Sequence, residues 1–178
     1  MDDSEQIQAS FDTALVGYLK LSVSLTGELN YLFEHHEDDQ NQYWRRTFVR
    51  ASWSLVDGYI YALREMCRVL APLRADVIGR SDGDLSINDR QEIGDKIKSV
   101  LKLAVKIFDL SVPLNFGGSE WVAVRDSIEK RHNVVHPRSA AIIFIADDEW
   151  KKQKDAISWV ISTFNLLDIA LQDKYSRQ

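Results

Sequence analysis

Apolar side chains recur in this sequence every three or four residues over many consecutive helical turns. In the first stretch, from about Ser4 to His36, the repeat places one serine and six apolar or aromatic side chains on a single helix face: Phe11, Leu15, Tyr18, Ser22, Leu25, Leu29 and Leu32. Such a stripe is typical of a helix that buries one face against other helices. Only three Pro and eight Gly occur in 178 residues, so few residues interrupt the repeat. The pattern therefore predicts long helices rather than short strands.

Four further stretches carry the same repeat and predict four more helices. They lie at about 42–74, 89–110, 119–135 and 147–174. The polar residues 37–41 and 76–89 separate the first three helices, and Pro113 separates the third from the fourth. Pro137 disfavours a helical conformation at His136, so the fourth helix should end there.

The apolar segment 140–146 lies between the last two helices and is rich in β-branched residues. Its composition fits either a short strand or a buried extended segment, and the sequence leaves both open. The acidic run 147–149 that follows suits a helix N-terminus. We expect residues 1–178 to form one all-α domain, an antiparallel up-and-down bundle of about five helices.

Composition and charge restrict where the chain works and what it binds. Its 45% of hydrophobic residues suffices for a packed core, and no apolar run reaches the length of a membrane span. Cys67 is the single cysteine, which indicates a reducing compartment, and the acidic N-terminus is unlike a signal peptide. We therefore expect a cytoplasmic protein without a membrane segment. The net charge of −5 argues against a general nucleic-acid coat protein but leaves room for a small basic site.

The sequence lacks the motifs of the common metal and cofactor sites. His132 and His136 have the spacing of two helical metal ligands, but Asn133 stands where a zinc peptidase carries its catalytic Glu, and no third ligand is recognisable. The acidic loop that begins at Asp82 has Ile87 and Ile93 where a calcium-binding EF-hand loop needs Gly and an acid. We therefore expect no metal and no cofactor.

The most informative segment lies at the end of the fourth predicted helix. There Arg131 is followed, after four intervening residues, by His136, and Pro137 comes next. This segment resembles the signature of the HEPN proteins, in which an Arg precedes a His by a similar interval near the end of a late helix. The same spacing rule also fits Arg125 and His132, so the position at a helix end gives the first pair its weight. The architecture is similar over nearly the whole chain, whereas the motif covers only a short segment.

The resemblance implies a metal-independent endoribonuclease that acts on RNA as a homodimer. It is also compatible with the role of a toxin or defence protein that has a cognate antitoxin or other partner protein. In that family His136 would act as general base or acid, and Arg131 would hold the phosphate and stabilise its extra negative charge. Asn133 would orient His136 or bind phosphate. Asp57 is the candidate for an acidic residue from an earlier helix, with an exposed or Arg-paired helical acid as the alternative.

The helical geometry of the motif favours a site built by two chains. Arg131 and His136 are about 140° apart around an ideal helix, so they cannot both point at one spot on the same face. Two copies around a dimer axis could place four such groups in a shared cleft.

Basic residues around the motif are the candidates for substrate binding. Between positions 125 and 138, four Arg or Lys stand against two acids. The candidates in this segment are Arg125, Lys130, His132 and Arg138. Phosphate is the group that such a local positive charge would bind.

A second basic run consists of Arg45, Arg46 and Arg50, beside Trp44, Phe48 and Trp53. Arg and aromatic side chains together can hold single-stranded RNA by charge and stacking. The alternative is that the aromatic rings face the core while the Arg side chains face water.

Two features bear on the choice between functions. Arg138 stands two residues after His136, where HEPN toxins that are neutralised by nucleotidyl transfer carry Tyr, so that regulation is not expected here. The alternatives to a nuclease are a non-catalytic HEPN-like binding or adaptor domain and a helical adaptor with a chance motif. The intact set Arg131, Asn133 and His136 favours the nuclease, whereas the acidic net charge favours a binding domain.

Overall fold

The computed structural model describes residues 3–35, 41–74 and 92–175, and every regular element in these ranges is helical. Their order along the chain is α1 (Asp3–Glu34), α2 (Gln42–Leu70), the 3₁₀ helix η1 (Ala71–Arg74), α4 (Ile93–Ile107), α5 (Ser119–Val135) and α6 (Asp147–Tyr175). The all-α bundle of about five helices expected from the sequence is thereby confirmed. The loop around Asp82 lies outside the described residues.

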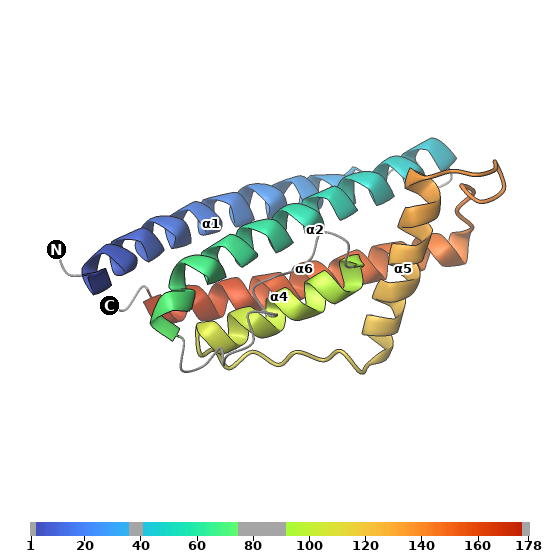
Figure 1. Ribbon diagram of the computed structural model, residues 1–178. Helices are drawn as coiled ribbons and strands as arrows, with labels where there is room; N and C mark the ends of the chain where they lie inside the picture. Colours follow the sequence, from blue (N-terminus) through green and yellow to red (C-terminus); the bar gives the residue numbers. More distant parts are fainter. Residues whose placement is uncertain (1–2, 36–40, 75–91, 176–178) are drawn as a thin grey trace.

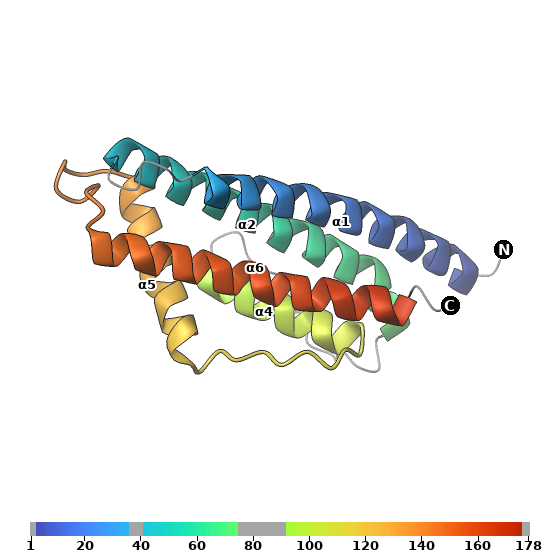
Figure 2. The same ribbon diagram turned by 180° about the vertical axis from the view of Figure 1, so that it is seen from behind.

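Four of the helices lie along a common direction, and α5 crosses them steeply at one end (Figures 1 and 2). The chain runs out along α1 and back along α2, while α4 and α6 point the same way as α2. The connector 108–118 carries the chain back along the bundle to the start of α5 (Figure 1). Within the described ranges, no helix combines the length and the apolar character that crossing a membrane requires.

The predicted apolar stripes form the core. In α1, the stripe residues Phe11, Leu15, Tyr18, Leu25 and Leu29 are all buried. They face the interior of the bundle, where α1 packs most extensively against α2. The stripe at three- and four-residue spacing thus lies on the face that α1 turns towards the bundle.

A buried polar cluster joins α1, α2 and α6 inside this core. Tyr18 Oη donates to Asp168 Oδ1 at 2.7 Å, and Ser22 Oγ donates to the other carboxylate oxygen. Tyr59 Oη donates to the backbone oxygen of Ser22 at 2.8 Å. Burial raises the pKa of Asp168, although the two hydroxyl donors act in the opposite direction.

Replacing Asp168 by Asn is expected to flatten the pH dependence of stability. Because the pKa of Asp168 is raised in the folded protein, its stabilising contribution is complete below the unfolded-state pKa of about 3.9 and is lost as pH rises through the folded-state pKa. Urea unfolding of both proteins between about pH 4 and pH 7 measures this. The free energy of unfolding of the wild type should fall relative to that of the variant as pH rises, and a constant difference would contradict the assignment.

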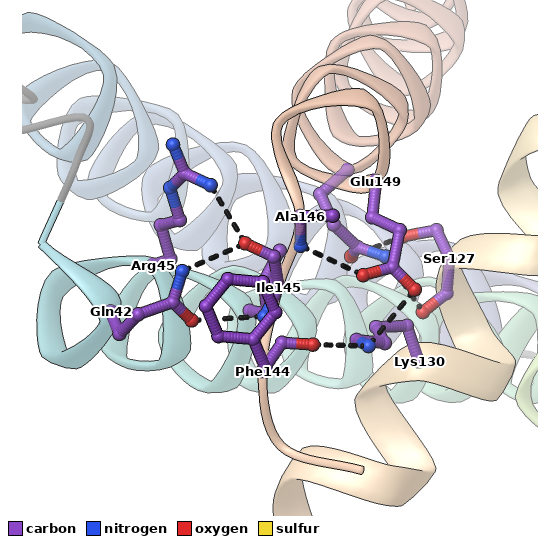
Figure 3. A network of polar contacts seen from close by, with 9 residues as sticks. Gln42, Arg45, Ser127, Lys130, Phe144, Ile145, Ala146 and Glu149 are labelled. Atoms are coloured by element: carbon purple, nitrogen blue, oxygen red, sulfur yellow. Dashed lines mark hydrogen bonds and ion pairs between the residues drawn. The ribbon is translucent and has the colours of Figure 1, made fainter. Parts of the chain in front are cut away.

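The segment 136–146 contains no strand and is held by side chains from neighbouring helices (Figure 3). Ile145 is buried, and its backbone exchanges hydrogen bonds of 2.8 and 2.9 Å with the side-chain amide of Gln42. Arg45 Nη1 also donates to the Ile145 oxygen at 2.7 Å, and Lys130 Nζ donates to the Phe144 oxygen at 2.6 Å. Of the two conformations that the sequence left open, the strand is absent, and the segment is anchored through a buried Ile145.

Two acidic residues at the start of α6 complete this anchor. Arg45 is buried and pairs with Asp147 at 2.6 Å. Glu149 Oε2 accepts a hydrogen bond of 2.9 Å from the Ala146 N–H, and Glu149 Oε1 lies 2.9 Å from Lys130 Nζ (Figure 3). The acidic first turn therefore does more than favour the helix dipole, because it ties the α5–α6 connector to both α2 and α5.

Candidate active site

One face of α5 is buried in the bundle, and the adjacent face, the free face, lines a cleft. Trp121, Val124 and Val134 pack into the bundle, and Ser127 Oγ donates to Gln153 Oε1 of α6 at 2.5 Å. These contacts fix the rotation of α5 about its axis. The residues on its free face therefore point consistently towards α2 and the start of α4.

That free face forms a cleft of about 660 Å³ together with α2 and the first turn of α4. The charged and titratable residues that line it are Asp57, Glu92, Lys96, Arg125, Glu129, Arg131 and His132. Four of the residues that the sequence predicted for the site thus meet in one place: Asp57, Arg125, Arg131 and His132. The cleft brings three cationic side chains and three acidic ones close together, so it is polar rather than strongly basic.

Arg131 and Asp57 form an ion pair across the cleft. Arg131 Nη2 lies 3.1 Å from Asp57 Oδ2, and the two side chains are 27% and 41% exposed. Burial raises the pKa of Asp57, while the positive charges of Arg131 and Lys96 lower it. Asp57 is therefore paired with an arginine, as the alternative interpretation expected. That arginine is Arg131 of the motif, so Asp57 also lies at the candidate site.

His136 lies at the end of α5 beside the cleft rather than in its wall. It is the C-cap of the helix, with φ −119° and ψ 68°, and its N–H donates to the His132 oxygen at 2.9 Å. The rings of His132 and His136 lie 5.2 Å apart, and both residues are exposed. His136 has left the helical conformation, so the angle that an ideal helix sets between it and Arg131 does not apply.

Lys130 and Asn133 lie on a different side of α5. Both line a smaller hollow of about 250 Å³ against α6, together with Glu149 and Gln153. Lys130 is engaged by Glu149 and by the Phe144 oxygen. The structure of a single chain therefore does not bring Lys130 or Asn133 into the cleft with Arg131.

The aromatic residues beside the second basic run belong mainly to the core. Phe48 and Trp53 are fully buried, as the alternative interpretation expected. Arg50 is exposed, and its Nη2 donates to the Val134 oxygen at 3.0 Å, which ties α2 to the last turn of α5. Arg46 is half-buried, and neither Arg46 nor Arg50 lines the cleft.

Two further residues noted in the sequence, Arg138 and Cys67, do not line the cleft. Arg138 is exposed in the connector after α5, outside the cleft wall. Cys67 is buried, and burial raises the pKa of its thiol, so it is unsuited to act as a nucleophile. Within the described ranges, no group of three or more His, Cys, Asp or Glu side chains is arranged to hold a metal ion.

The sequence did not identify Lys96 as a site residue, although Lys96 lines the cleft. It lies in the first turns of α4, far from the motif along the chain. The only signal was that position 96 falls between the buried positions Ile93 and Ile97 of an amphipathic helix. That signal predicts a surface lysine but does not say what it faces.

Comparison of the chain with protein-family models, with the curated proteins and with the solved structures gave no match. The residues of the cleft and their chemistry therefore carry the functional assignment.

Proposed function

We propose that this protein is a metal-independent endoribonuclease of the HEPN type that acts as a homodimer. One observation carries the proposal. The motif arginine, Arg131, is positioned by Asp57 of α2 in a cleft that it shares with His132, and the ring of His136 lies beside that of His132. An arginine and two histidines around a polar cleft are suited to transfer at a phosphodiester without a metal ion.

The proposed reaction is attack of a ribose 2′-hydroxyl on the neighbouring phosphorus. His136 takes the proton of the hydroxyl, the new P–O bond forms, and the bond to the 5′-oxygen of the next nucleotide breaks. A histidine, from the same chain or from the second copy, gives a proton to that leaving oxygen. Arg131 binds the nonbridging oxygens and stabilises the negative charge of the transition state.

A second copy of the chain would complete the site. In one chain Arg131 and His132 line the cleft, whereas Asn133 lies on another side of α5 and His136 lies at the helix end. Val135, next to His136 at the end of α5, is an exposed apolar residue that a partner helix could cover. A twofold axis near α5 would bring the two copies of the motif together.

The test of this function combines cleavage and mass. The protein is expected to cut single-stranded or structured RNA in the presence of excess EDTA, because its own side chains supply the acid, the base and the cation. Sedimentation should give a mass near twice 20.4 kDa. Failure to cut any of these RNAs, or a clean monomer at high micromolar concentration, would contradict the proposal.

A non-catalytic HEPN-like binding or adaptor domain is the second candidate. The observation in its favour is that Asp57, Glu92 and Glu129 offset the positive charges of the cleft. RNA that binds without being cut would support it. The role of toxin or defence protein, with an antitoxin or other partner protein, rests on the family resemblance, and a small partner gene beside this one would support that role.

A further inference from the structure

The cleft extends well beyond the motif along α5. Arg125 precedes Arg131 by six residues, which is about 9 Å along the helix axis. Arg125 and His132 are seven residues apart and fall within about 20° of each other around that axis, and both line the cleft. Arg125 and Arg131 therefore place two positive charges about 9 Å apart along the axis of the helix that lines the cleft.

Lys96 adds a second positive charge to this wall from another helix. The first turn of α4 lies close to α5 at Gly94, where an added Cβ would meet Ile128 Cδ1 at 3.4 Å. Lys96, two residues further on, lines the same cleft as Arg125. Its charge is also close enough to Asp57 to lower the pKa of that carboxyl.

A further hollow continues the cleft past Arg125. It has a volume of about 180 Å³ and shares Glu92, Arg125 and Ile128 with the cleft. Its other lining residues are Gly94, Asp95, Lys98 and Trp121. A chain molecule that enters beside the two histidines can therefore continue along α5 towards the start of α4.

We propose that Lys96 and Arg125 bind a second backbone phosphate of a single-stranded RNA, one that is distinct from the phosphate attacked beside Arg131. This inference rests on the proposed nuclease function and names the path of its substrate. Lys and Arg suit phosphate. The distance along α5 places Arg125 beyond the reacting group, and Lys96 lines the same cleft from α4. Glu92 and Glu129, which also line the cleft, repel phosphate, so binding on this side depends on the two cations.

The test uses oligodeoxynucleotides that contain one ribonucleotide, so that a single 2′-hydroxyl defines the cleaved bond. The strand is lengthened by one nucleotide at a time on either side of that bond. For the wild type, kcat/KM should rise when an added phosphate on one side reaches the second subsite. Lys96→Met and Arg125→Ala should each lower kcat/KM for the longer strands by about tenfold, mainly by raising KM. Lys96→Arg should retain the gain, because it keeps the charge.

Controls separate the subsite from the fold and from the nuclease itself. Lys106→Ala removes a charge from an exposed position ten residues further along α4 and should leave the length dependence unchanged. In binding of an all-deoxy strand, each cleft variant should also reduce the dependence of log affinity on log salt by about 0.7, the value for one phosphate contact on a single strand. Two results would contradict the subsite while leaving the nuclease proposal in place. In the first, the wild type cuts RNA and the cleft variants keep its length dependence. In the second, the cleft variants lose as much rate on the shortest substrate as on the longer ones. If the wild type cuts no RNA, both proposals fall.

Discussion

Replacement of His136 by Ala is expected to lower the rate of RNA cleavage at least about a hundredfold, as for the loss of a general acid or base. The residue is exposed at the C-cap of α5, and the cap hydrogen bond comes from its backbone, so the fold should not change. His35→Ala, which removes another exposed histidine at a helix end, is the matched control and should retain full activity. Rates on a fixed RNA, with circular dichroism of each variant, measure the effect.

Arg131→Ala is expected to cause a loss of similar size for a different reason. It removes the cation that stabilises the transition state, and it leaves Asp57 without its ion partner in the cleft. The control is Arg68→Ala, which breaks an exposed Arg–Glu65 pair on α2 at 3.2 Å and leaves the cleft intact. Activity that persists in both His136→Ala and Arg131→Ala would contradict the nuclease assignment, and the binding domain would then be the better interpretation.

Most of the helices were predictable because their limits are set locally. Residues 119–135 were predicted as a helix and form one, since Gly118 and Pro137 flank that stretch. The end of α4 was placed too late, at residue 110 rather than at Ile107. The chain leaves the helix at Asp109, which has a positive φ of 48°, and Asp is one of the few residues other than Gly that adopt this conformation readily. No glycine or proline marked that end in the sequence.

The site was predictable where one helix supplies it and less so where helices meet. Grouping by closeness in sequence placed Lys130 and Asn133 with Arg131, but the helical period turns them towards α6. The same period joins Arg125, Glu129 and His132, which do share the cleft. The pairing of Arg131 with Asp57 and the position of Lys96 depend on how α2 and α4 pack against α5, and one sequence does not contain that information directly.

Mixing two inactive variants is expected to restore activity if the site is shared between chains. In a heterodimer of Arg131→Ala with His136→Ala, one shared site has lost both groups, and the other keeps the intact arginine of one chain and the intact histidine of the other. Random pairing makes about half of the dimers mixed, so the mixture should recover about a quarter of wild-type activity, whereas each variant alone has at most about a hundredth.

The same mixture distinguishes a shared site from one within a single chain. The ring of His136 lies only 5.2 Å from that of His132, which itself lines the cleft, so one chain could in principle supply both the arginine and the histidine. In that case every chain in the mixture carries one broken site, and no activity returns. Two affinity tags, one on each variant, allow the heterodimer to be isolated and assayed by itself. An isolated heterodimer as inactive as its parents would assign Arg131 and His136 of each site to the same chain, whereas about half of wild-type activity would place the active site across the dimer axis.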